Sequence, residues 1–172
     1  MLEPYRVLDL TDERGQLAGM MLADLGAEVI LVEPPTGSRS RAVGPFVEGR
    51  EEDPEASLWF WSYNRGKRSI TLDLDSEEGQ TRLKALVEGA DVILESSDVG
   101  TMARRGLSYE ELSALNPQII FTSISAFGQN GPKASWRATD LTVAAAGMQM
   151  NMQGDDDRAP LRIPLDQSFL HA

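Results

Sequence analysis

The feature that most constrains the fold of this chain is a strand, helix, strand pattern close to its start. A short apolar run begins at Val7, apolar residues recur at helical spacing from 17 to 25, and a second apolar run covers 29–32. Two continuous apolar runs that flank a helix are typical of parallel strands buried on both faces. Gly26 follows the last periodic residue, where a helix ending in a left-handed turn favours glycine. The pattern predicts a right-handed βαβ unit.

A βαβ unit of this kind binds its ligands at the carboxyl ends of its strands, which here correspond to residues 11–16 and 33–41. The glycines that follow the first strand are Gly15 and Gly19, which do not form the G-x-G-x-x-G fingerprint of dinucleotide sites. Asp12 in the same turn would repel a phosphate. The sequence therefore argues against a nicotinamide dinucleotide in this turn.

The rest of the chain continues the alternation of strands and helices. We expect strands at 69–74, 92–94 and 119–125 and helices at 58–63, 75–87 and 140–150. The helix at 75–87 is expected to begin with a capping box of Asp75 and Glu78. A second capping box, Ser108 and Glu111, predicts a further short helix. Residues 36–57, rich in glycine, proline, serine and charge, are expected to form a long surface loop. The fold class that this order predicts is α/β: a doubly wound, mostly parallel, Rossmann-like sheet with helices on both faces.

Composition excludes several classes of function. The formal net charge of -11 argues against binding to nucleic acid or to an anionic membrane, and no apolar run approaches the ~18 residues of a membrane span. With no cysteine and a single histidine, His171, the chain has no thiolate or histidine-rich metal site, and we expect a cytoplasmic protein without a metal. The chain stops within an apolar pattern at 169–172, so we interpret residues 1–172 as the N-terminal α/β domain of a longer protein.

Cationic residues stand at several of the expected strand ends and turns. They are Arg39, Arg41, Lys67, Arg68, Arg104, Arg105 and Arg137. A ligand with several phosphates needs such charges from different loops, because the forked donors of arginine match phosphate oxygens. Each of these residues taken alone is better explained as solvated surface charge.

Seven short blocks carry a more specific signal, because they occur together and in order. The blocks are Val7–Thr11, Leu22–Ile30, Val32–Pro35, Asn64–Leu74, Ala90–Glu95, Leu115–Ile120 and Ser123–Pro132. In order and spacing they resemble the family III CoA-transferases, the CaiB/BaiF family. The resemblance covers essentially the whole chain. It implies an enzyme that binds acyl-CoA as a substrate, moves CoA to a carboxylic acid acceptor, and forms an interlocked homodimer in its longer, complete form.

The resemblance also implies catalytic residues. The family's nucleophilic aspartate follows a proline-led extended segment, and the match here is Asp166, which would form an aspartyl-CoA thioester. A register a few residues further along would place Phe169 there and leave no nucleophile. Asp140 matches a second acidic residue of the site. From the residues alone, both aspartates are also explained as helix caps.

CoA contacts follow from the same resemblance. It implies contacts by Arg14, Gln16, Arg41, Lys67, Arg68, Arg104 and Arg137, with the loop that contains Arg14 and Gln16 near the thioester end. Two alternatives stay open. An α-methylacyl-CoA racemase would need an acid/base pair, and the histidine that the racemases use ahead of the position of Asp140 is absent here. The other alternative is a CoA-binding domain without activity.

Overall fold

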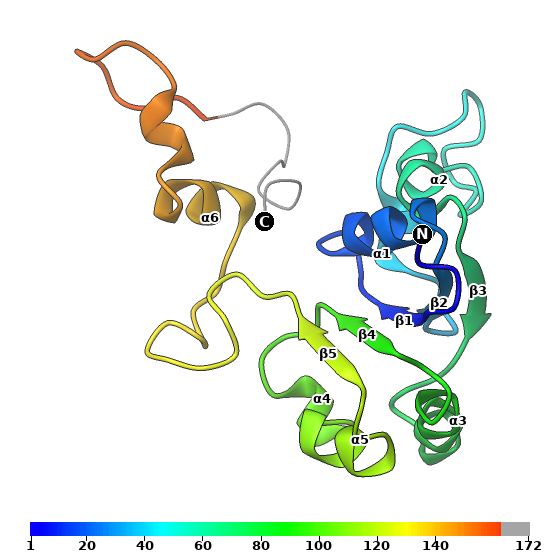
Figure 1. Cartoon of the computed structure of the whole chain (residues 1–172). Helices are drawn as coiled ribbons and strands as arrows, with labels where there is room; N and C mark the ends of the chain where they lie inside the picture. The colour runs from blue at the N-terminus through cyan, green and yellow to red at the C-terminus, as the bar shows by residue number, and fades with distance from the viewer. Residues whose placement is uncertain (163–172) are drawn as a thin grey trace. The chain divides into compact units, whose positions relative to one another are not determined.

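The computed structural model describes residues 1–162 and contains a five-stranded sheet in the order β3-β2-β1-β4-β5 (Figure 1). Every strand pairs in parallel with its neighbours. The strands are β1 (Arg6–Leu10), β2 (Glu28–Glu33), β3 (Arg68–Thr71), β4 (Val92–Glu95) and β5 (Ile120–Ser123). The predicted α/β fold is confirmed, and the sheet is parallel throughout rather than mostly parallel.

Helices cover both faces of this sheet (Figure 1). The α-helices are α1 (Gln16–Asp24), α2 (Leu58–Asn64), α3 (Glu77–Val87), α4 (Thr101–Arg104), α5 (Tyr109–Leu115) and α6 (Asp140–Ala146), with 3₁₀ helices at Arg39–Ala42 and Gln149–Met152. Helices α1 and α2 lie on one face, and α3, α4 and α5 lie on the other. The chain divides into two compact units, Met1–Ser125, which holds the whole sheet, and a second that begins at Ala126. No helix among the described residues is both long and apolar enough to cross a bilayer.

Alternating side chains of the strands build two apolar cores. Val7 and Val29 belong to the core that packs with residues of α1, whereas Leu8 and Ile93 belong to the larger core under α3, α4 and α5. Neighbouring residues of a strand point to opposite faces, so continuous apolar runs are what a sheet covered on both faces requires. The chain leaves β1 toward β2 and β3, then returns to β4 on the other side of β1. The carboxyl ends of β1 and β4 therefore form the topological switch point of the sheet.

The helix boundaries confirm some of the expected signals and correct others. The capping box of Ser108 and Glu111 is present at the start of α5. Helix α3, however, is capped by Ser76, whose Oγ accepts from the Gly79 N–H, and not by the predicted Asp75. The expected helix at 140–150 is shorter, because the chain takes a left-handed conformation at Met148, where φ is 62°.

The segment 36–57 is not the simple surface loop that its composition suggests. Ser38, Ser40 and Ser57 are all buried in it. Their hydroxyls are satisfied within the segment, since the Ser38 and Ser40 Oγ atoms lie 2.8 Å apart and the Ser57 Oγ donates to the Val43 carbonyl. Buried hydroxyls need such partners, and here they make the segment part of the folded unit.

A buried ion pair joins the centre of the sheet to the segment before β3. The Lys67 Nζ lies 2.7 Å from the Asp9 Oδ2, and the two side chains are 1% and 0% exposed. The Lys67 Nζ also donates to the Gln16 carbonyl and to the Asn64 Oδ1, each at 2.9 Å. Burial lowers the pKa of Lys67 and outweighs the raising effect of Asp9. A Cβ at Gly19 would lie 2.1 Å from the Asp9 Oδ2, so α1 can approach the pair only with glycine there.

Removing one partner of this pair should strongly destabilise the protein. In Lys67→Met the Asp9 carboxylate stays buried without its counter-charge, and we expect the free energy of unfolding to fall by about 3–5 kcal/mol. Urea unfolding followed by tryptophan fluorescence measures the change, because Trp59 and Trp61 lie in α2 next to Asn64. Arg68→Met is the matched control, since Arg68 is 78% exposed and its loss should cost at most ~1 kcal/mol. Equal losses in the two variants would contradict the structural role of Lys67.

Candidate functional site

The loops at the carboxyl ends of the strands form the candidate site. An α/β sheet binds its ligands in this position, and most of the residues predicted to contact CoA lie on or beside these loops. The residues predicted to contact CoA fall into three groups according to their contacts in the structure. Some hold loops together, some are buried beneath the loops, and some are exposed.

Arg14 bridges the two loops at the switch point. Its Nη2 donates to the Asp12 Oδ2 at 2.7 Å and to the Ser96 carbonyl at 2.5 Å. The Asp12 N–H in turn donates to the Ser96 Oγ at 2.9 Å, which closes the link between the ends of β1 and β4. Burial would raise the pKa of Asp12, but the hydrogen bonds from Arg14 and Ser96 outweigh it and lower that pKa. Arg14 therefore uses, for contacts within the protein, the N–H donors that a ligand would otherwise bind.

Arg41 has a comparable place at the end of β2. Its Nε and Nη2 meet the Glu33 carboxylate at 2.6 and 2.9 Å, and its guanidinium lies 3.9 Å from the centre of the Phe60 ring. The Arg41 Nη1 donates to Glu55 at 2.8 Å. Burial would raise the pKa of Glu33, but hydrogen bonds from Arg41, from Ser69 and from a backbone N–H lower it to about 2. Glu33 is therefore ionised at neutral pH and anchors Arg41.

Gln16 and Lys67 lie beneath the loops rather than on their surface. Gln16 is fully buried, its Nε2 donates to the Ser38 Oγ at 3.1 Å, and its Oε1 accepts from Asn64 at 2.9 Å. Lys67 belongs to the buried pair with Asp9. Both side chains support the loop that follows β1 from inside the protein.

The remaining predicted cations are exposed. Arg68 pairs with Glu28 at 3.0 Å, and Arg104, in the last turn of α4, donates to the Thr101 Oγ1 at 2.7 Å. Arg137 belongs to the second unit and makes no hydrogen bond or ion pair with the described part of the chain. All three guanidinium groups are exposed to solvent, although those of Arg68 and Arg104 already have a partner.

Of the two predicted catalytic aspartates, the structure describes only Asp140. Asp140 is the first residue of α6 and is 8% exposed, and the cap of that helix is Thr139, whose Oγ1 accepts from the Thr142 N–H. The cap role is thus filled without the Asp140 carboxylate, which lies 3.9 Å from the Arg162 Nη2. Asp166 and His171 lie outside the described residues.

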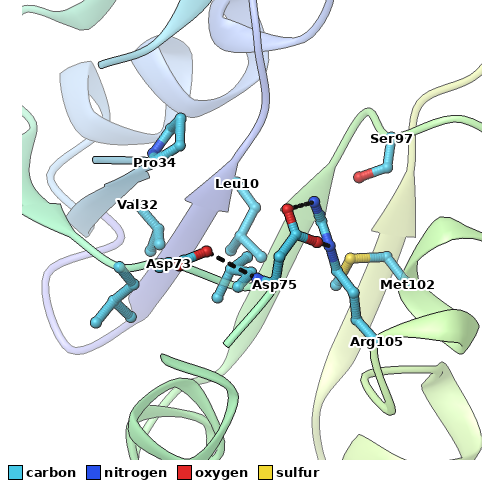
Figure 2. Close-up of a pocket in the computed structure, with 10 residues that line it drawn as sticks. Leu10, Val32, Pro34, Asp73, Asp75, Ser97, Met102 and Arg105 are labelled. Atoms are coloured by element: carbon cyan, nitrogen blue, oxygen red, sulfur yellow. Dashed lines mark hydrogen bonds and ion pairs between the residues drawn. The ribbon is translucent and has the colours of Figure 1, made fainter. Parts of the chain in front are cut away.

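A cavity of about 140 Å³ opens at the carboxyl edge between the ends of β1, β2 and β3 and helix α4 (Figure 2). Its lining consists of Leu10, Val32, Pro34, Leu72, Asp73, Leu74, Asp75, Ser97, Met102 and Arg105. The volume is below the ~300–1,000 Å³ of sites that enclose a drug-sized ligand, so the cavity could take one group of a larger ligand. Arg105 is the cation among these lining residues, and it is absent from the predicted contacts although the sequence placed it among the cations at turns.

Metal binding finds no support in the described residues, where no three histidine, cysteine, aspartate or glutamate side chains form a cluster able to hold an ion. The cavity instead combines apolar walls with one guanidinium, two carboxylates and a hydroxyl. Such a mixture suits an organic ligand that has an apolar or aromatic part and an anionic part.

Comparison with known proteins gives a consistent result. The model of the family described as "CoA-transferase family III" matches residues 2–170. The succinyl-CoA:(R)-benzylsuccinate CoA-transferase subunit BbsE of Thauera aromatica is 40% identical over 96% of this chain and 40% of its own length. The succinate–glutarate CoA-transferase of Agrobacterium fabrum is 41% identical over 94% of this chain and 41% of its own.

A solved structure agrees with these relatives. A CaiB/BaiF family protein from Brucella suis is 40% identical and superimposes with a TM-score of 0.87 over 96% of this chain and 44% of its own chain. The predicted family resemblance is therefore confirmed. The chain spans about 40% of the length of the curated relatives it matches.

The Glu33–Arg41 pair predicts how stability depends on acid. Because folding lowers the pKa of Glu33 from 4.5 to about 2, its contribution is complete above pH 4.5 and is lost as the pH falls through about 2. The shift corresponds to ~3 kcal/mol. In Glu33→Gln the free energy of unfolding should therefore be lower at pH 6 and should fall less between pH 4.5 and 2. Glu48→Gln, which removes an exposed carboxylate, is the control, and an acid dependence in Glu33→Gln identical to that of the control would contradict the assignment.

Proposed function

The chain belongs to CoA-transferase family III, and on that premise we propose that the protein transfers CoA from an acyl-CoA to a carboxylic acid acceptor. The observation that carries the proposal is the family match over residues 2–170. The relatives described above are named as CoA-transferases, which favours CoA transfer over the racemase alternative. The activity is proposed for the whole protein, because this chain spans about 40% of those relatives.

In this proposal CoA binds through the carboxyl-edge cavity and exposed cations, without a glycine fingerprint. The apolar walls around Leu72 and Met102 suit a ring or a methylene chain, and a guanidinium at the rim suits a phosphate. Arg68, Arg104 and Arg137 remain predicted direct contacts, since their side chains are exposed. Arg68, however, is the first residue of β3 and so lies at the amino end of that strand, whereas the cavity is at the carboxyl edge.

The other residues predicted to contact CoA affect its binding indirectly, because they hold the loops in place. The donors of Arg14 and Arg41 are engaged by Asp12 and Glu33. Gln16 and Lys67 are buried. We assign these side chains the task of holding the edge loops in the geometry that a ligand meets, because a preorganised site binds at lower entropic cost.

The proposed chemistry is covalent and needs no redox partner. The Asp166 carboxylate attacks the thioester carbonyl of the donor, the C–S bond breaks, and a mixed anhydride and CoA thiolate form. The thiolate then attacks the Asp166 carbonyl, which releases the donor acid and leaves an aspartyl-CoA thioester. The acceptor carboxylate repeats the exchange in reverse, so that acceptor acyl-CoA leaves and Asp166 is regenerated. Asp140 would support these steps, and two such subunits would form the interlocked homodimer.

Arg104→Ala should weaken CoA binding. Loss of a charge-assisted hydrogen bond to a phosphate costs about 1–3 kcal/mol of binding free energy, which titration calorimetry with CoA measures as a rise in Kd. Arg82→Ala is the matched control, because Arg82 on α3 is also exposed and pairs with Glu78. An unchanged Kd for Arg104→Ala would remove Arg104 from the site, and binding of NADH in place of CoA would overturn the proposed function.

Asp166→Asn in the full-length protein should abolish turnover and preserve CoA affinity. An amide keeps the size of the side chain but cannot form the anhydride or the thioester. Succinyl-CoA is the first donor to test, because the names of both curated relatives contain succinyl-CoA or succinate. Hydroxylamine followed by mass spectrometry should modify Asp166 only after acyl-CoA is added.

Asp157→Asn is the control for that experiment, since Asp157 is an aspartate close to Asp166 in the sequence and is 83% exposed. Asp140→Asn should slow turnover and still allow trapping at Asp166. Full activity in Asp166→Asn, or trapping at another carboxylate, would remove Asp166 from the mechanism.

A further inference from the structure

The cavity at the carboxyl edge contains an ion pair whose two partners come from different loops. Asp75 lies between β3 and α3, where its N–H donates to the Asp73 Oδ1 at 3.0 Å. Arg105 directly follows α4, and its backbone N–H caps that helix by donating to the Thr101 and Met102 carbonyls. Figure 2 shows the Asp75 carboxylate and the Arg105 guanidinium facing each other among the lining residues.

The pair uses the donors of Arg105 that a phosphate would need. Its Nε lies 2.7 Å from the Asp75 Oδ1 and its Nη2 lies 3.2 Å from the Asp75 Oδ2, which is a two-pronged contact. Arg–phosphate contacts have the same forked geometry. The third nitrogen, Nη1, makes no hydrogen bond with any described residue.

Asp75 is the partner that can leave. Its side chain is 76% exposed, whereas that of Arg105 is 26% exposed. Ion pairs in contact with water contribute little to stability, so breaking this one costs little and the freed carboxylate is hydrated at once. Arg105 stays in the wall of the cavity, next to Met102 and Ser97.

Because of the charge of the cavity lining, an anion that binds Arg105 has to displace Asp75 from it. The lining residues include one guanidinium, that of Arg105, and two carboxylates, those of Asp73 and Asp75, so the lining carries an excess of negative charge. A phosphate cannot share the Nε and Nη2 donors with Asp75, and the two anions would repel each other at that distance.

We propose that Asp75 competes with a phosphate group of CoA for Arg105, so that binding exchanges the Asp75–Arg105 pair for a phosphate–Arg105 pair. The inference rests on the proposed function, which makes CoA the ligand. It assigns Arg105 as a phosphate ligand and Asp75 as the residue that limits affinity and disfavours weakly charged ligands.

The test is a double-mutant cycle on the full-length protein, with the Kd for CoA as the readout. Asp75→Asn removes the competing charge and should lower the Kd by ~5-fold, as expected for loss of one surface ion pair. Arg105→Gln should raise the Kd by ~10-fold or more. In the Arg105→Gln background, Asp75→Asn should give no further tightening, because the two residues act through one contact.

The control is Asp24→Asn, which also removes one negative charge and one exposed ion pair, the 2.6 Å contact with Arg65, and lies away from the cavity lining. Its Kd should match the wild-type value. Asp75→Ser is a second variant that should tighten binding as Asp75→Asn does, and thermal unfolding verifies that each variant is folded.

The outcomes separate this inference from the function on which it rests. If wild-type protein does not bind CoA, both the proposed function and the exchange are wrong. If it binds CoA and neither Asp75 variant binds more tightly than Asp24→Asn, only the exchange is wrong. Equal tightening by Asp75→Asn with and without Arg105 would also overturn it, because the effect would not pass through that contact.

Discussion

The buried Lys67–Asp9 pair is the contact on which the arrangement of the sheet and its loops depends. It joins the central strand to the segment before β3, and the remaining donors of Lys67 reach α1 and α2 through Gln16 and Asn64. A buried charge pair is tolerable only when both ions are satisfied together, since breaking it leaves a charge in a medium of low dielectric constant. Four elements are thereby held in one relative position.

Polar contacts continue from this pair to the carboxyl edge. Asn64 donates to Gln16, Gln16 donates to Ser38, and the Ser38 N–H donates to the Glu33 carboxylate that also binds Arg41. Arg14 makes a second link at the switch point. The cations of the edge therefore divide by their partners. Arg14 and Arg41 are held by the little-exposed carboxylates of Asp12 and Glu33 and shape the loops, whereas the partner of Arg105, Asp75, is 76% exposed.

Residue types indicated where cations stand at the turns, but not the task of each residue. The sequence identified cations at turns, and the ordered blocks identified the family that the comparisons confirm. It could not separate Lys67 from Arg68, although one side chain is 1% exposed and its neighbour 78%. Nor could it show that Arg105 lines the cavity whereas its neighbour Arg104 does not. The cap of α3 was predicted wrongly for a local reason: Asp75 and Ser76 are adjacent and both residue types suit a helix cap, which in the structure is Ser76.

By itself the sequence determined the order of the strands and longer helices along the chain, the parallel α/β class and the Ser108 cap, because these depend on apolar spacing and hydrogen bonds within a few residues. The short helix α4 was not expected from it. The tertiary structure alone decided the strand order, the burial of Ser38 and Ser40 in an otherwise polar loop, and the partners of Lys67 and Arg105. The physical reason is distance along the chain. Lys67 and Asp9 are 58 residues apart and Arg105 and Asp75 are 30 apart, so only folding brings each charge to its counter-charge. Of the two pairs, folding removes only Lys67 and Asp9 from water.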